Sequence, residues 1–217
     1  MATPGFPLPL RNALAELALA ACEDDAAVAA LGWLAAPVDA PPPPAAARLA
    51  AVHLIDLDGR ALLPVHAPHA AAVAAHASRA LRSAAAFRRG SGGAGVVRAC
   101  QIAAALWNER LFFEVHEVLE AVWKTAAGAT RQALQGVIQI AVAYHHLMHG
   151  NRRGARTLLA EGRSRLASAP ATALPALDVG ALLTATAPWE GALARHETPA
   201  DEPPPLVLAA PMPRGRA

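Results

Sequence analysis

Four ionisable side chains in one predicted helix could do acid–base or metal chemistry. Glu114, His116, Glu117 and Glu120 lie in segment 111–125, where apolar residues recur at helical spacing. His116 and Glu120 share a helix face, as a metal-binding pair on a helix must. Glu114 and Glu117 are expected to point to solvent in an isolated amphipathic helix. If another element covers that side, a reactive cluster forms in which the glutamates are the candidate catalytic residues.

The next predicted helix, 130–149, would supply polar partners for this cluster. Apolar residues occupy nearly its whole circumference, so we expect it to be buried. Its only polar stripe consists of Gln135, Gln139 and His146. Buried amides and imidazoles need partners, because an unsatisfied group costs about 1–3 kcal/mol. The carboxylates and His116 of the preceding helix are the nearest candidates in sequence. The two glutamines are therefore candidate ligand-binding residues, and His116 and His146 are candidate ligands of a divalent metal ion, unless the whole set forms a structural hydrogen-bond network.

A basic turn follows that helix. Gly150 suits the end of one helix and Asn151 the N-cap of the next, which leaves Arg152, Arg153 and Arg156 without a structural role. A basic face could contact phosphates, but no aromatic residues alternate with these arginines and no known nucleic-acid motif is present. Nucleic acid is therefore disfavoured. A protein partner or a second copy of the chain is favoured over nucleic acid, and a solvated charged face is favoured over either.

Segment 100–166 resembles a bacterial family, the domain of unknown function 309. The hallmark is an aromatic pair before Glu-x-His-Glu-x-Leu-Glu and Trp, then Leu-Gln-Gly-x-Ile-Gln, then His-x-x-x-Gly-Asn-x-x-Gly-Ala. The matching residues are Phe112, Phe113, Glu114, His116, Glu117, Leu119, Glu120, Trp123, Leu134, Gln135, Gly136, Ile138, Gln139, His146, Gly150, Asn151, Gly154 and Ala155. The resemblance implies an all-helical bundle whose Glu, His and Gln residues form one site, with Trp123 and Asn151 as further ligand-binding candidates. It implies no reaction, because none is established for the family.

Three interpretations of the cluster remain open. It could be a hydrogen-bond network that fixes helix register in a non-enzymatic protein-interaction module. It could instead bind a divalent metal ion or a small polar ligand, and a metal-activated water would then permit hydrolysis. The Glu-x-x-His repeat of di-iron bundles and the His-Glu-x-x-His motif of zinc proteases are both missing from the sequence. Weak nucleic-acid binding through the basic turn is the third interpretation.

The whole chain is predicted to be mainly helical, because alanine supplies much of its 54% hydrophobic content. An N-terminal helical region, 1–89, carries a short β-hairpin near Asp58-Gly59, a dipeptide typical of tight hairpin turns. A Gly-rich linker at 90–95 then leads to an antiparallel helical-bundle domain, 96–187. The Pro-rich segment 188–217 is expected to be disordered. The predicted helices are 10–21, 24–36, 68–89, 96–110, 111–125, 130–149, 152–168 and 175–186.

Charge and cysteine usage favour a cytoplasmic protein. The net charge is only +2, and the two cysteines, Cys22 and Cys100, have no metal-like or disulfide-like spacing. The run Leu19-Ala20-Ala21-Cys22 looks like a lipoprotein cleavage box, but Arg11 and Glu16 interrupt the apolar segment that export requires. The longest uncharged apolar stretch falls short of the roughly 20 residues of a membrane helix. We therefore expect no membrane association.

Overall fold

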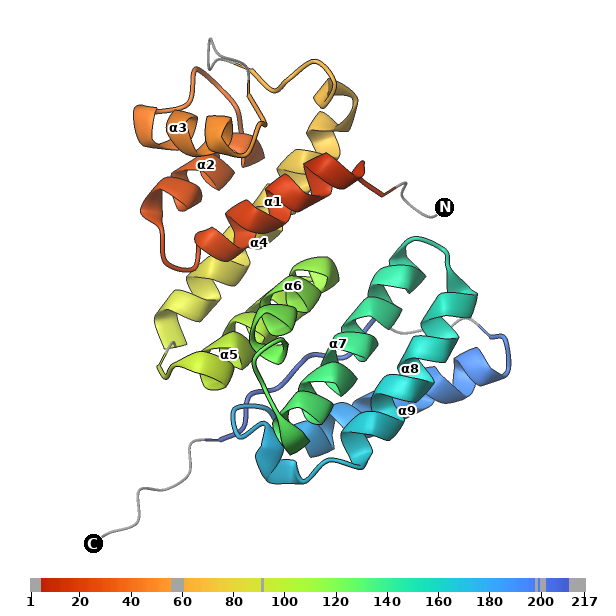
Figure 1. The fold of residues 1–217 in the computed structure, drawn as a ribbon. Helices are drawn as coiled ribbons and strands as arrows, with labels where there is room; N and C mark the ends of the chain where they lie inside the picture. Colours follow the sequence, from red (N-terminus) through yellow and green to blue (C-terminus); the bar gives the residue numbers. More distant parts are fainter. Residues whose placement is uncertain (1–4, 56–60, 91, 198, 200–201, 211–217) are drawn as a thin grey trace, which may run out of the picture.

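A computed structural model describes residues 5–55, 61–90, 92–197, 199 and 202–210 (Figure 1). These residues form nine α-helices and no extended strand, which confirms the prediction of a mainly helical chain. The helices are α1 (Leu8–Ala20), α2 (Asp25–Ala35), α3 (Pro43–Ala51), α4 (Ala70–Gly90), α5 (Gly95–Asn108), α6 (Phe112–Trp123), α7 (Gly128–Met148), α8 (Arg152–Ala167) and α9 (Val179–Ala194). Two 3-10 turns, Ala67–His69 and Ala171–Ala173, precede α4 and α9.

Side-chain caps define where three of the helices begin. The carboxylate of Asp24 accepts a hydrogen bond from the Ala26 amide at the start of α2, and Asp178 does the same at α9. Asn151 caps α8 by accepting from the Gly154 amide at 2.9 Å, as predicted. Each cap satisfies an amide that has no partner within its helix. Gly150 has φ 77°, a left-handed conformation that ends α7 just before this cap.

The described residues on either side of the predicted hairpin near Asp58 do not form an extended pair of strands. Among the described residues, only a single antiparallel bridge joins Ile55 to Leu62, while Val52 ends α3. The Asp58-Gly59 dipeptide lies outside the described residues. Alternating apolar residues are also compatible with the end of a helix followed by a turn, so the alternation alone predicted a longer strand than the one bridge observed.

The C-terminal part contains more structure than predicted. Helix α9 continues through Pro188 to Ala194, and Trp189 is buried. The Pro-rich segment therefore does not begin at 188 as a solvated tail. Further on, Leu206 is only 1% exposed. Apolar anchors among the prolines explain the difference, because they offset the entropy that ordering costs.

The N-terminal helices pack directly against the predicted bundle. Helix α1 contacts α6, and α4 contacts α5, whereas α7, α8 and α9 lie on the other side of α6 (Figure 1). Buried residues from both regions belong to one hydrophobic cluster. The division into separate domains stays a prediction. Helices of the N-terminal region nevertheless cover part of α5 and α6, the first two helices of the predicted bundle.

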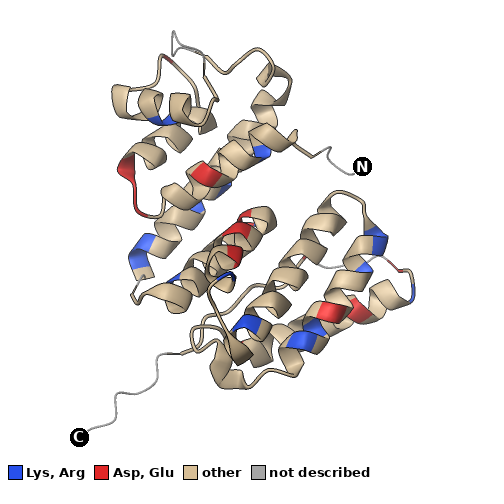
Figure 2. Cartoon of the chain, in the orientation of Figure 1, with Lys and Arg blue, Asp and Glu red and all other residues tan. Residues whose placement is uncertain are grey.

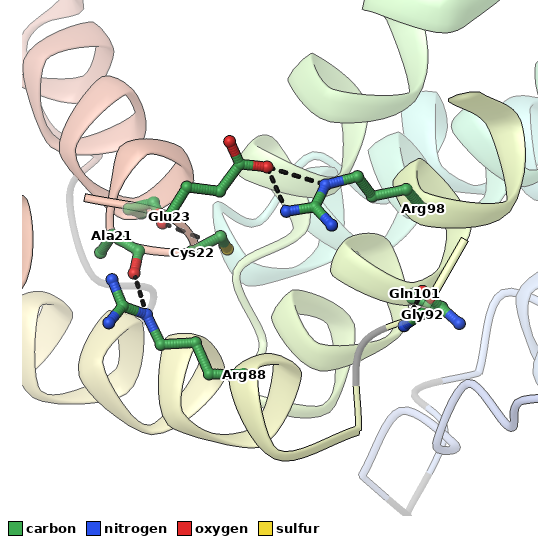
Figure 3. Close-up of polar contacts among 8 residues, drawn as sticks. Ala21, Cys22, Glu23, Arg88, Gly92, Arg98 and Gln101 are labelled. Atoms are coloured by element: carbon green, nitrogen blue, oxygen red, sulfur yellow. Dashed lines mark hydrogen bonds and ion pairs between the residues drawn. The ribbon is translucent and has the colours of Figure 1, made fainter. Parts of the chain in front are cut away.

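Two arginines, one before and one after the glycine-rich segment 90–95, bind the turn between α1 and α2 (Figure 3). Arg88, at the end of α4, donates to the Ala21 carbonyl at 2.9 Å. Arg98, in α5, binds the Glu23 carboxylate, with 2.7 Å from its Nε. One turn is thus held by helices before and after the glycines, and this restricts how far the two regions can separate.

Helices α7 and α8 approach each other through two glycines. A Cβ added to Gly162 would lie 2.8 Å from the Gly136 carbonyl oxygen, closer than a real Cβ contact permits. We expect Gly162→Ala to lower the free energy of unfolding by about 1–3 kcal/mol, because the backbones must separate. Urea unfolding followed by circular dichroism measures this.

Gly32 provides the matched control, because it also lies inside a helix but has nothing within 4 Å of an added Cβ. We expect Gly32→Ala to stabilise the protein by about 0.5–1 kcal/mol, since alanine restricts the unfolded chain. Equal effects of the two substitutions would mean that the α7–α8 contact is looser than described.

Both cysteines are buried and unpaired. Burial raises the pKa of the Cys22 thiol to about 11 and that of Cys100 to about 12. Both thiols are therefore poor nucleophiles at neutral pH. In the part of the chain that the structure describes, no helix combines the length and the apolar character needed to cross a bilayer.

Candidate functional site

A pocket of about 360 Å³ lies where the N-terminal helices cover α6 and the end of α7. Its walls come from the start of α1, the first half of α4, the joint between α5 and α6, and the last turn of α7. Figure 2 shows acidic positions along α6 and basic positions on the neighbouring α4. The lining residues are Gly5, Phe6, Arg11, Ala72, Ala75, His76, Arg79, Arg110, Leu111, Phe112, Phe113, Glu114, His145, Met148 and His149.

The most buried charged group of the pocket is Glu114, which is 2% exposed. It lies in the first turn of α6, where a carboxylate is favoured by the helix dipole. The prediction that Glu114 points to solvent is wrong, because α4 covers this side of the helix. His76 of α4 places Nε2 at 3.3 Å from a Glu114 oxygen.

The pair formed by Glu114 and His76 is close but not aligned. His76 is itself buried, and its Nε2 has no hydrogen bond to any described residue. The 3.3 Å separation therefore reflects proximity without hydrogen-bond geometry. Phe6 packs edge-on against the imidazole, with the ring centres 5.7 Å apart. The result is a buried polar atom at the pocket wall that could bond to a ligand.

Arginines from three different elements surround this pair. Arg79 follows His76 on α4, and burial lowers its pKa while the nearby Glu114 opposes that effect. Arg11 of α1 stacks on the Phe113 ring at 4.1 Å, and its Nε is buried without a hydrogen-bond partner among the described residues. Arg110, in the α5–α6 joint, has φ 61° and forms an ion pair with Glu202.

His145 is a neutral group on the α7 side of the pocket. Burial, with smaller contributions from His149 and Arg11, lowers its pKa to about 4. Its ring lies 4.5 Å from that of His149, centre to centre. The imidazole is thus uncharged at neutral pH and presents an aromatic surface with one donor and one acceptor.

This pKa predicts a loss of stability in mild acid. The unfolded histidine has a pKa near 6.5, whereas the folded one has a pKa of about 4. Between these two pH values, the unfolded state is protonated at His145 and the folded state is not. The stabilisation is complete above about pH 6.5 and falls as the pH drops. From pH 7.5 to pH 5.0 we expect His145 to account for a loss of about 2 kcal/mol.

Urea unfolding at these two pH values measures the effect. The His145→Gln variant retains polarity but cannot titrate, so its stability should fall less than that of the wild type. His53→Gln is the control, because His53 is an exposed histidine in the turn after α3 and does not line the pocket. An equal pH dependence in the wild type and in His145→Gln would contradict the prediction.

The other predicted residues of α6 lie outside the pocket. His116 Nδ1 is 3.1 Å from the carboxylate of the adjacent Glu117, and both are half-buried. Glu120 forms an ion pair with Lys124 at 3.3 Å, one turn along the same helix. Of the predicted catalytic glutamates, the structure places only Glu114 among the pocket residues.

The predicted residues of α7 and its neighbours have separate partners. Gln139 donates to Glu161 and accepts from Arg165, so it connects α7 to α8. His146 Nδ1 lies 3.3 Å from Asn151 Nδ2. Trp123 is covered by the guanidinium of Arg131 at 3.8 Å. Gln135 is half-buried on α7 and does not line the pocket.

These contacts do not assemble the predicted metal site. In the described part of the chain, no group of three or more His, Cys, Asp or Glu side chains is placed to hold a metal ion. His116 and His146 instead contact different neighbours, Glu117 and Asn151. The donor set therefore gives no support to binding of a divalent metal by these two histidines.

Arginines after the basic turn have structural partners. Arg163 bonds to Glu190 at 2.7 Å and to Thr186, which holds α9 on α8. Arg156 lies 3.0 Å from a ring nitrogen of His196. At these positions the charge contributes to packing of the C-terminal helices.

The residues that sequence reasoning missed come from the N-terminal region. His76, Arg79 and Arg11 approach Glu114, yet they lie more than 30 positions away in sequence. A signal was present in Arg79, which is a charged residue in an alanine-rich helix next to a histidine at i−3. It could not be interpreted without knowing which helix it faces.

The fold and pocket define a mainly helical protein with a mainly apolar pocket, which also contains several charged groups, between its N-terminal helices and a central helix pair. The sequence profile of a family described as Domain of unknown function (DUF309) matches residues 101–158, about a quarter of the chain. This confirms the predicted resemblance over that segment, which runs from α5 into α8. Comparison with curated proteins gives no match, and comparison with solved structures gives none either.

Proposed function

We propose that the protein binds a small carboxylate with an apolar or aromatic body in the pocket around Glu114. The observation that carries this proposal is the surplus of arginine over carboxylate around one apolar cavity. Among the lining residues that the structure describes, Glu114 is the one carboxylate beside Arg11 and Arg79, whereas Arg110 has its own partner in Glu202. One positive charge therefore remains to be matched, which suits a ligand with one negative charge.

The remaining walls favour an apolar body on that ligand. Phe6, Phe112 and Phe113 line the cavity, together with alanines of α4. Its volume of about 360 Å³ is at the lower end of the range for small-molecule sites. The unbonded Nε2 of His76 and the neutral His145 offer hydrogen bonds for orientation. The lining residues that the structure describes include no Ser, Thr or Cys nucleophile, so binding is supported better than acyl transfer.

The buried thiols support a related proposal about location. Cys22 and Cys100 stay unpaired in the core, which suits a reducing compartment such as the cytoplasm. A second copy of the chain or a protein partner remains a proposal that no described contact addresses.

Isothermal titration at low salt tests the ligand class. Benzoate, phenylacetate and 3-phenylpropionate are compared with their neutral amides, which have nearly the same shape. We expect at least one acid to bind at least tenfold more tightly than its amide. If no acid in the series is preferred over its amide, the proposal is wrong.

Two arginines of α4 provide matched variants for the same titration. Arg79→Gln removes the charge that lies in the pocket and should weaken acid binding at least tenfold. Arg89→Gln removes an exposed charge from the last turn of the same helix and should leave binding unchanged. An equal loss in both variants would show that the effect comes from overall charge and not from the pocket.

A further inference from the structure

A second site lies along α5 and the end of α4 and holds a segment from the C-terminal part of the chain. Residues 202–209 run along the end of α5, and Leu206 is buried there with 1% exposure. Beside them is a cavity of about 400 Å³. Its walls are Ala86, Phe87, Gly90, Gln101, Ala104, Ala105, Asn108, Pro205, Leu206, Val207 and Leu208. We call the α4 and α5 side of this cavity the α5 groove.

The backbone of the segment is recognised by side chains of α5. Asn108 accepts from the Leu206 amide at 3.0 Å through Oδ1 and donates to the Leu206 carbonyl at 3.3 Å through Nδ2. An amide side chain that pairs with both the N–H and the C=O of one residue recognises extended backbone, and this recognition does not depend on the side chains of the bound segment. Trp107 Nε1 donates to the Pro204 carbonyl at 2.7 Å, and Arg110 donates to that of Pro203.

The other edge of the segment also forms hydrogen bonds. The Asp178 amide donates to the Val207 carbonyl at 3.0 Å, and the Ala209 amide donates to Ala176 at 3.0 Å. A bridge between Leu177 and Leu208 lies between these two bonds. The segment is therefore bound on both edges, as a peptide is bound by a recognition domain.

The composition of the segment reduces the cost of binding. Pro203, Pro204 and Pro205 have restricted φ angles before binding, so little backbone freedom is lost when they dock. Leu206 follows them as the single deeply buried anchor. A Trp donor, a run of prolines and one apolar anchor together are typical of sites for proline-rich peptides.

We propose that the α5 groove is a binding site for extended peptides with prolines before a leucine, and that residues 202–209 are its resident ligand. The same chemistry would accept such a peptide from outside whenever the resident segment is released. This proposal does not rest on the proposed carboxylate site, although Arg110 belongs to both sites.

The test uses a labelled peptide of residues 202–209 and the full-length chain. Leu206→Ala removes the anchor of the resident segment and leaves the groove intact. By fluorescence anisotropy, we expect the peptide to bind Leu206→Ala at least tenfold more tightly than the wild type, whose groove is filled. Adding Asn108→Ala to that variant should weaken binding at least tenfold. A peptide with alanine at the leucine position is the control and should not bind.

Hydrogen exchange of the wild type gives a second measurement that needs no variant. Millimolar peptide is expected to speed exchange of the chain's own Leu206 amide, because it displaces the segment from Asn108. If Leu206→Ala fails to fold, this measurement decides. Absence of peptide binding to a folded Leu206→Ala, binding that does not depend on Asn108, or unchanged exchange in the wild type would each overturn the proposal.

Discussion

Replacing Glu114 by alanine should lower the free energy of unfolding by about 3 kcal/mol. The carboxylate is 2% exposed and lies beside His76, with the guanidinium of Arg79 nearby. Without it, the partly buried guanidinium of Arg79 loses the nearby negative charge that favours its charged form, and removing a charged partner from a buried site is among the costlier substitutions. Urea unfolding at pH 7.5 measures the loss. Glu114→Gln keeps the volume of the side chain and should therefore lose less unfolding free energy than Glu114→Ala.

Glu117 is the matched control for this prediction. It lies one helical turn further along α6 and is near a histidine too, but its side chain is 38% exposed. Exposed ion pairs contribute about 0–1 kcal/mol, so Glu117→Ala should have an effect in that range. Similar losses for the two glutamates would mean that Glu114 is not enclosed by α4, and the proposed pocket would lose its basis.

Replacing Trp107 by alanine should cost about 3–5 kcal/mol, as for other buried aromatic residues. Trp107 has no exposed surface and packs edge-on against Phe112 and Tyr144, with ring centres 5.3 and 5.5 Å away. The substitution also removes the hydrogen bond to Pro204. We therefore expect lower stability in urea together with faster hydrogen exchange of the segment 202–209.

Trp123 serves as the comparison, since it was a candidate ligand-binding residue in the sequence analysis. It is half-buried at the end of α6 and is covered mainly by Arg131. Trp123→Ala should cost about 1–2 kcal/mol, less than a fully buried aromatic residue, and should leave exchange of 202–209 unchanged. A larger effect at Trp123 than at Trp107 would contradict the assignment of Trp107 to the core.

The sequence was sufficient to predict the helices of the bundle, because their signals are local. Asn151 is an N-cap that needs only the residues after it, and the apolar spacing of α6 and α7 needs only the helical period. Glu114 was chosen as a site residue for its position in a helix with other ionisable groups. The structure places Glu114 among the lining residues of the pocket, with surroundings that differ from the expected ones, and its role as a site residue stays a prediction.

The partners of Glu114 could not be predicted, because they depend on long-range packing. The helices α1 and α4 are rich in alanine, which packs closely in many orientations and gives no preferred face. The metal hypothesis failed to gain support for the same reason. The position of a residue on one helix face does not determine which residue of another helix packs opposite it. In the structure, His116 contacts Glu117 and His146 contacts Asn151.

The distance along the chain between Asn108 and Leu206 also determines how long the groove stays empty during synthesis. The two residues are 98 positions apart, and a ribosome adds roughly 5–20 residues per second. Each new molecule therefore carries its groove on α5 for about 5 to 20 seconds before the segment that fills it has been made. During synthesis the groove is open to whatever peptide is nearby, so the nascent chain is the form in which a competing partner or a chaperone has its best access.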